Sequence, residues 1–133
     1  MLKVLIAEES RCMQERLITM LEPSARWHLV QNSQEAVDRM KEHIRRGRGF
    51  DLVIMDIMMP FKEGCAVVRE IREFEKRNGV HPREEAKILF VATLDDPDDL
   101  LVNQIRCGAD GYMTRPFGRR TLLKAITSLG LEV

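Results

Sequence analysis

The chain has 133 residues, and lysine plus arginine equal aspartate plus glutamate at 21 each. This length suits one domain with a buried core, so we expect residues 1–133 to form a single domain. A net charge of zero gives no overall attraction for nucleic acid, and no direct nucleic-acid binding is expected. The apolar runs have strand length, well short of the roughly 20 residues of a membrane span. Without a signal-peptide pattern at residues 1–7, we expect a cytoplasmic protein that does not insert into membranes.

The three cysteines, Cys12, Cys65 and Cys107, are widely spaced and form no Cys-x-x-Cys motif. This odd number and spacing indicate neither a disulfide framework nor a zinc site. We therefore expect buried, reduced thiols at all three positions.

Strand and helix patterns alternate from the beginning of the chain. The apolar run at 3–7 predicts a strand, and apolar residues at helical spacing over 11–21 predict a helix with Ser10 as its N-cap. A second strand is predicted at 27–31. Asn32 then begins a second helix with a capping-box-like pattern.

The central stretch of the chain is the most informative. Residues 52–55 form a continuous apolar run, which is typical of a strand covered on both faces of a parallel sheet. Asp56 ends this run, and Pro60 and Gly64 favour a loop after it. Open α/β sheets bind their ligands beyond the carboxyl ends of the strands, which is where Asp56 would lie. A third amphipathic helix is expected after the loop, closing near 78–79.

The last part of the chain repeats the alternation. A fourth strand is predicted at 87–93, and a helix begins at Asp96 and Pro97 and ends before Gly108. A short fifth strand at 111–114 leads to a last helix whose apolar stripe runs over 122–129. Five strands alternating with five helices predict a doubly wound α/β fold, with a parallel sheet covered on both faces.

Five chemically compatible side chains follow the predicted strands: Glu8, Glu9, Asp56, Thr93 and Arg115. The carboxyl ends of parallel strands share one edge, so these side chains should face one crevice. Three carboxylates close together repel unless a hard cation neutralises them, and such oxygen ligands suit Mg²⁺. A phosphoryl group would fit opposite, with Asp56 as nucleophile. Each residue alone also has an ordinary explanation, as a strand cap, a solvated charge or a surface hydroxyl.

From Lys3 to about Leu129, the chain resembles the receiver domains of two-component response regulators. This resemblance implies the flavodoxin-like strand order 2-1-3-4-5 and a cis Arg115–Pro116 peptide bond. It is carried by Glu8-Glu9, the Asp56-Ile-Met-Met-Pro60 block with Gly64, Thr93, and the Gly108-Ala109-Asp110-Gly111-Tyr112 run that leads to Arg115-Pro116-Phe117.

The resemblance implies a phosphoprotein that works in a phosphorelay. A histidine kinase or a phosphotransfer protein would donate a phosphoryl group to Asp56, and Thr93 and Arg115 would contact that group. Such a domain catalyses at most its own phosphorylation and dephosphorylation, so we do not expect an enzyme.

The resemblance also implies a cofactor and an output. Tyr112 would act with Thr93 as an aromatic switch that changes the surface offered to a downstream protein target. Mg²⁺ would be held by Glu8, Glu9, Asp56 and the backbone carbonyl of Met58.

Three positions depart from the family's usual pattern. Both members of the acidic pair, Glu8 and Glu9, are glutamates, whereas the family usually has at least one aspartate there. Arg115 replaces the family's lysine and offers a planar fork in place of a compact ammonium group. Leu94 follows Thr93 where a small residue is usual, and its bulk would narrow the access to the acceptor.

Three other functions remain open. A receiver-like interaction module would keep the fold without being phosphorylated, and the departures favour it. A haloacid-dehalogenase-type phosphatase would need a second aspartate two residues after Asp56, where Met58 stands. A flavin-binding protein would need a hydroxyl- and glycine-rich loop after the first strand, where Glu8 and Glu9 stand.

Other polar features have simpler interpretations. The basic stretches at 45–48 and 119–120 carry no interleaved aromatic residues, so we expect solvated helix ends. His28, His43 and His81 are not spaced as metal ligands, and we expect surface or packing roles for them.

Overall fold

A parallel sheet forms the centre of the computed structural model, which describes residues 1–57, 64–92 and 107–133. The strand order is β2-β1-β3-β4-β5, and every neighbouring pair is parallel. The predicted doubly wound α/β fold and its flavodoxin-like order are therefore confirmed. The strands are β1 (Leu2–Ala7), β2 (Ala25–Val30), β3 (Leu52–Asp56), β4 (Lys87–Ala92) and β5 (Gly111–Thr114).

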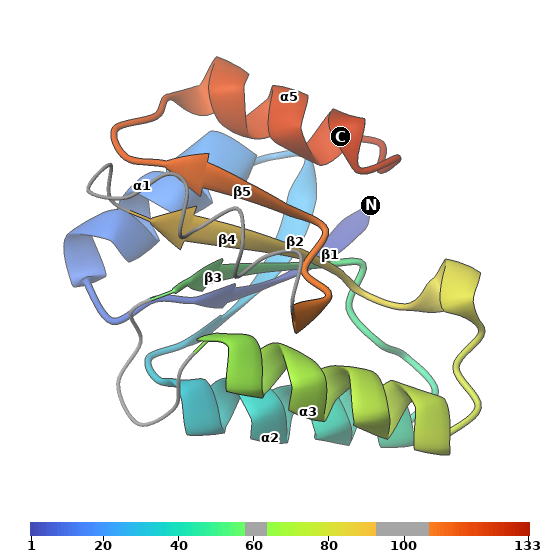
Figure 1. Cartoon of the computed structure of the whole chain (residues 1–133). Coiled ribbons are helices and arrows are strands. Elements are labelled where there is room, and N and C mark those ends of the chain that lie inside the picture. The colour runs from blue at the N-terminus through green and yellow to red at the C-terminus, as the bar shows by residue number, and fades with distance from the viewer. Residues whose placement is uncertain (58–63, 93–106) are drawn as a thin grey trace.

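Helices cover both faces of this sheet (Figure 1). One face carries α1 (Arg11–Leu21) and α5 (Arg119–Ser128), and the other carries α2 (Ser33–Arg45) and α3 (Gly64–Arg77). A short 3₁₀ turn, η1 (Pro82–Glu84), precedes β4. The helix predicted between 96 and 107 falls largely outside the described residues. Within the described ranges, no helix has the length and apolar character needed to cross a bilayer.

The continuous apolar run of β3 is explained by two cores. Val53 and Met55 belong to the core on the α2 and α3 side, whereas Leu52 and Ile54 belong to the core on the α1 and α5 side. All four side chains are almost fully buried. Burying a side chain of this size contributes about 2 kcal/mol, so the strand that ends in Asp56 is firmly anchored.

Both predicted N-caps are present. Ser10 Oγ accepts a hydrogen bond from the backbone N–H of Met13 at 3.3 Å, and Asn32 Oδ1 accepts one from Glu35 N–H at 2.9 Å. The Glu35 carboxylate in turn accepts from Gln31 N–H at 3.0 Å. These bonds satisfy backbone donors that have no partner inside the helix.

The start of α3 differs from the prediction, because Gly64 begins the helix and does not lie in the preceding loop. The reason is close packing against β4. A β-carbon added to Gly64 would lie 3.0 Å from Phe90 Cε1 and 3.3 Å from Ile57 Cγ1. Any other residue at this position would push the Phe90 or Ile57 side chain aside, so a glycine suits this close approach of α3 to the sheet.

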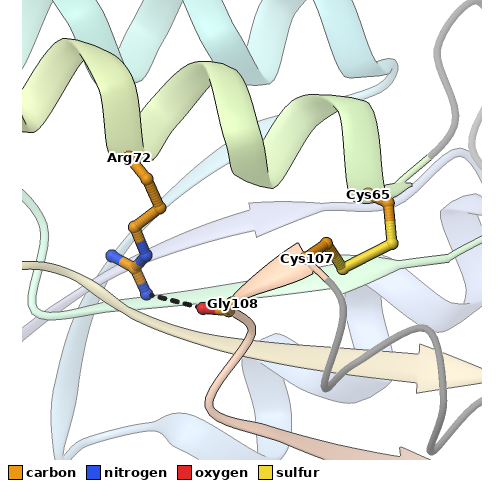
Figure 2. The surroundings of a disulfide bond; sticks show 4 residues. All are labelled: Cys65, Arg72, Cys107 and Gly108. Carbon is orange, nitrogen blue, oxygen red and sulfur yellow. Dashed lines mark hydrogen bonds between the residues drawn. A yellow bond between two sulfur atoms is a disulfide. The ribbon is translucent and has the colours of Figure 1, made fainter.

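The expected reduced state was wrong for two of the three cysteines. Cys65, in the first turn of α3, and Cys107, just before β5, form a disulfide with their Cα atoms 5.1 Å apart (Figure 2). Both residues are buried, as expected, but they are not free thiols. Cys12 is free and exposed, so its predicted burial was also wrong. The pairing joins residues separated by 42 positions, which come together because the start of α3 lies beside the residues that precede β5 (Figure 2).

Candidate functional site

Three strand ends place charged side chains at one edge of the sheet. Glu8 follows β1, Asp56 ends β3 and Arg115 follows β5. Backbone hydrogen bonds extend the sheet to two of these positions, because Glu8 N–H donates to Val30 O at 3.0 Å and Arg115 N–H donates to Ala92 O at 2.8 Å. Hydrogen bonds to the neighbouring strands therefore hold the backbone of Glu8 and Arg115 in place just beyond the ends of β1 and β5.

The Arg115 guanidinium joins the two carboxylates. Its Nη2 atom lies 2.9 Å from Glu8 Oε2 and 3.2 Å from Asp56 Oδ2. The Glu8 side chain is only 3% exposed, whereas those of Asp56 and Arg115 are 16% and 25% exposed. Within the described part of the chain, Arg115 Nε is buried and has no hydrogen-bond partner.

Burial controls the ionisation of Glu8. Loss of solvent raises the pKa of its carboxyl, and the nearby negative charge of Asp56 raises it further. A hydrogen bond from Ser10 N–H to Oε1 at 3.0 Å and the positive charge of Arg115 both act to lower this pKa. Burial dominates, so Glu8 holds a proton more readily than an ordinary glutamate.

Gln14 supports the site and was missed by the sequence interpretation. Its Nε2 donates to the backbone carbonyl of Glu8 at 2.6 Å, and its side chain is buried in α1. A signal was present, because Gln14 is at helical spacing from the buried residues Leu17 and Leu21. A polar residue in an apolar stripe needs a buried partner, and here the partner is the main chain at Glu8.

The other predicted site residues are placed less closely. Glu9 is exposed, and no contact within the described residues joins it to Glu8 or Asp56. Tyr112 is half-buried on β5 and packs against the core on the α2 and α3 side. Met58, Thr93 and Leu94 lie outside the described residues. The roles given to these five residues stay predictions.

Metal binding can be judged from the groups that converge. In the ranges that the structure describes, no group of three or more acidic, histidine or cysteine side chains is arranged to hold an ion. Glu8 and Asp56 nevertheless offer adjacent carboxylate oxygens, which are the ligands that Mg²⁺ prefers. These two carboxylates would supply part of the ligands that the ion needs. Arg115 Nη2 lies beside both of them and offsets part of their negative charge.

The arrangement places a carboxylate beside a fixed positive charge. Asp56 is a partly exposed carboxylate on a rigid strand, and Arg115 is a permanent cation beside it. An anionic group that approaches the Asp56 carboxylate would also come close to the Arg115 guanidinium, which would offset its negative charge. The cis Arg115–Pro116 bond predicted for the turn that carries this cation is confirmed.

Comparisons with known proteins point to one family. Residues 4–127 match the family described as the response regulator receiver domain. The chemotaxis protein CheY of Halobacterium salinarum is 30% identical over 128 residues, which cover 96% of this chain and 95% of that protein.

Two solved structures extend the likeness. One is the co-crystal structure of the Saccharomyces cerevisiae histidine phosphotransfer signalling protein Ypd1 and the receiver domain of its downstream response regulator Ssk1. The match has a TM-score of 0.79 and 27% identity, and covers 97% of this chain and 88% of that one. The other is the receiver domain of the Pseudomonas aeruginosa PAO1 sensor histidine kinase PA1611, with a magnesium ion coordinated in its active-site cleft. Its TM-score is 0.77 at 25% identity, with 98% of each chain covered. The chain therefore belongs to the response regulator receiver domain family.

Proposed function

We propose that this receiver domain accepts a phosphoryl group on Asp56 from a histidine kinase or a histidine phosphotransfer protein. The observation that carries the proposal is the position of Asp56 at the end of buried β3, with its Oδ2 3.2 Å from Arg115 Nη2. A structural neighbour that was crystallised with a phosphotransfer protein supports this kind of donor.

The transfer forms one bond and breaks another. An Asp56 carboxylate oxygen attacks the phosphorus of a phosphohistidine, and the bond from phosphorus to the imidazole nitrogen breaks. The electron pair of that bond stays on the imidazole, which then takes a proton. Asp56 becomes an acyl phosphate, and the adjacent guanidinium of Arg115 offsets the added negative charge.

Mg²⁺ is the proposed cofactor. Glu8 and Asp56 would hold it, together with the predicted ligands Glu9 and the Met58 carbonyl. The ion would offset charge on the phosphoryl oxygens when bound. Support comes from the adjacent carboxylates of Glu8 and Asp56, and from the magnesium ion in the PA1611 receiver domain.

The proposed output is altered binding to a downstream protein. Tyr112 is half-buried on β5 and lines a shallow groove together with Pro116, Thr121 and Lys124. A change in the orientation of the Tyr112 ring would therefore change the surface next to α5. The coupling of the Tyr112 ring to Thr93 remains a prediction. The cytoplasmic location of the protein also remains a prediction.

A second candidate function is a receiver-like module that binds partners without being phosphorylated. One observation favours it. Arg115 already offsets part of the charge of Glu8 and Asp56, so both carboxylates have a cationic partner within the protein itself.

Intact-mass spectrometry distinguishes the two functions. The parent protein and Asp38→Asn, an exposed control on α2, should each gain one phosphoryl mass from a small phosphodonor or a phosphorylated phosphotransfer protein in the presence of Mg²⁺. Asp56→Asn should gain none, and EDTA should suppress the reaction in the parent. A parent protein that stays unmodified with every donor would exclude phosphorylation and leave the second function as the proposal.

A further inference from the structure

A second charged region lies at the opposite edge of the sheet from Asp56. Lys3 and Arg26 pair near the amino ends of β1 and β2, whereas Asp56 is at the carboxyl end of β3. A cleft of about 420 Å³ opens beside them. We call it the basic cleft, and it is lined by Lys3, Arg26, His28, His43, Arg46 and Arg48.

The positive charge of the basic cleft is only partly balanced by nearby acids. Among the residues that the structure describes, no ion pair joins Lys3, Arg26 or Arg48 to a carboxylate. Arg46 is the exception, because its Nη2 lies 2.9 Å from Glu42 Oε1. Asp51 is also close, but its carboxylate accepts from the backbone N–H of Lys3 at 2.8 Å.

The cleft is built on an ordered base. Lys3 Nζ lies 2.6 Å from His43 Nδ1, donates to Arg48 O at 2.7 Å, and stands 4.8 Å from the ring centroid of Phe50. The rings of His28 and His43 pack against Phe50 at centroid distances of 5.3 and 4.5 Å. Phe50 itself is buried in the core. The central groups of the cleft are thus held in place before any ligand arrives.

These groups disfavour one another's charge. Burial lowers the pKa of Lys3, and the charges of Arg26 and Arg48 lower it further, against an opposing effect of Asp51. Burial and then the charge of Lys3 lower the pKa values of both His28 and His43. An anion in the cleft would reverse this mutual repulsion.

We propose that the basic cleft binds a small polyphosphate anion, either free or as the phosphate chain of a nucleotide. Arginine forks match phosphate oxygens in pairs, and two exposed arginines reach the cleft from different segments, Arg26 from β2 and Arg48 from the connection to β3. The volume suits a few linked phosphates. A nucleic acid is disfavoured, because neighbouring strand residues face opposite sides, which turns Trp27 away from Arg26 and His28.

The test is isothermal titration calorimetry of the whole chain with tripolyphosphate. EDTA is present throughout, so that magnesium-dependent phosphate chemistry at Asp56 is removed, and a sodium chloride titration of matched ionic strength gives the background. Saturable binding to one site is expected. Arg26→Gln and Arg48→Gln should each weaken it about tenfold, the usual loss of one charge-assisted contact.

Matched variants keep the result specific. Arg77→Gln, an exposed change of equal charge on α3, should leave the affinity unchanged. Asp56→Asn should also leave it unchanged, which separates this site from the proposed phosphorylation. Equal weakening by Arg77→Gln, or heats no larger than those of sodium chloride, would overturn the proposal. Melting curves of each variant confirm that it is folded.

Two further ligands identify the source of the phosphate. ATP that binds as tightly as tripolyphosphate would mean that the phosphate chain alone is recognised, and tighter binding of ATP would assign the cleft to a nucleotide. Both results support the proposal. Duplex or single-stranded DNA that binds more than about tenfold tighter than tripolyphosphate, with the same dependence on Arg26 and Arg48, would overturn it in favour of a nucleic-acid surface.

Discussion

Two arginines in this protein each bridge acidic side chains, Arg72 three of them and Arg115 two, and their surroundings differ. Arg72 on α3 lies 2.8 Å from both Glu75 Oε1 and Asp110 Oδ2. It also donates to the backbone carbonyl of Ala86 at 2.8 Å and to that of Gly108 at 3.4 Å (Figure 2). Arg115 makes the corresponding pair with Glu8 and Asp56, but its Nε finds no partner within the described residues.

The acids of the Arg72 network are also bound by the backbone. Glu75 Oε2 accepts from Ala86 N–H at 2.9 Å, and Asp110 Oδ2 accepts from Ile88 N–H at 2.8 Å. This network therefore fixes α3 to β4 and to the approach of β5. The Arg115 group has similar exposure, and one of its acids, Glu8, accepts a backbone hydrogen bond, from Ser10 N–H at 3.0 Å. The Arg72 network binds the backbone on several sides and holds the fold, whereas the Arg115 group joins side chains at the edge of the sheet where open α/β folds bind ligands.

The largest effect is expected for Arg72→Leu. Removing this guanidinium leaves Glu75, which is 2% exposed, as an unpaired buried acid, so the free energy of unfolding should fall by about 3–5 kcal/mol. Urea denaturation measures the loss. Arg77→Leu, which removes an exposed arginine of the same helix, should cost under about 0.5 kcal/mol. Similar losses for both variants would mean that the Arg72 network does not hold the fold.

A smaller effect that Mg²⁺ reverses is expected for Arg115→Leu. Without the guanidinium, Glu8 and Asp56 repel each other, which should cost about 2 kcal/mol in EDTA. Mg²⁺ at millimolar concentration should restore most of this loss, and calorimetry should show tighter Mg²⁺ binding than in the parent. Mg²⁺ should give Arg72→Leu no such recovery. Equal recovery of the two variants would remove the proposed metal site from Glu8 and Asp56.

Gln14→Leu should cost about 1 kcal/mol, the usual value of one hydrogen bond, because the variant leaves the Glu8 carbonyl without its side-chain donor. Misplacement of Glu8 should also weaken Mg²⁺ binding, which calorimetry measures. Asn78→Ala removes a comparable bond to a backbone carbonyl at the end of α3 and is the control, because it should leave Mg²⁺ affinity unchanged. Unaltered Mg²⁺ affinity in Gln14→Leu would limit this residue to packing.

The smallest effect concerns pH. Burial raises the pKa values of both Glu8 and Glu75 above the ordinary 4.5. Above pH 4.5 the unfolded chain therefore loses these protons first, and stability falls as pH rises through each raised pKa, by at most about 1.4 kcal/mol per pH unit for each group.

Mg²⁺ separates the two contributions, because it should favour the charged form of Glu8 alone. In Glu75→Gln, Mg²⁺ should flatten the remaining dependence on pH, whereas in Glu8→Gln it should leave that dependence unchanged. Urea denaturation between pH 4.5 and 7, with and without Mg²⁺, measures both slopes. If Mg²⁺ flattened the pH dependence equally in the two variants, the assignment of Mg²⁺ binding to Glu8 would be contradicted.

The sequence predicted what depends on local pattern. The apolar run of β3, the N-caps Ser10 and Asn32, and the strand order implied by the family resemblance are all present. The wrong or missing parts depend on tertiary contacts. The Cys65–Cys107 pairing needs two segments to meet, and spacing along the chain carries no trace of that meeting.

The acidic pair shows the same limit at a single site. Glu8 and Glu9 are chemically alike, but the structure buries the first and exposes the second. Successive residues at a strand end point in different directions, so both could not be placed from composition alone. Arg115 was expected near a phosphoryl group, and its contact with both carboxylates emerged only from the packing of three strands.

The disulfide also changes the chain entropy of forming the site. Asp56 and Arg115 are 59 residues apart along the backbone. Asp56 lies shortly before Cys65, and Arg115 lies shortly after Cys107. The path from Asp56 to Arg115 through the disulfide is therefore roughly threefold shorter than the path along the backbone. This shorter path lowers the entropic cost of bringing Asp56 and Arg115 together by about 1 kcal/mol. In the oxidised chain the acceptor and its cation are thus near neighbours in connectivity even before the sheet forms.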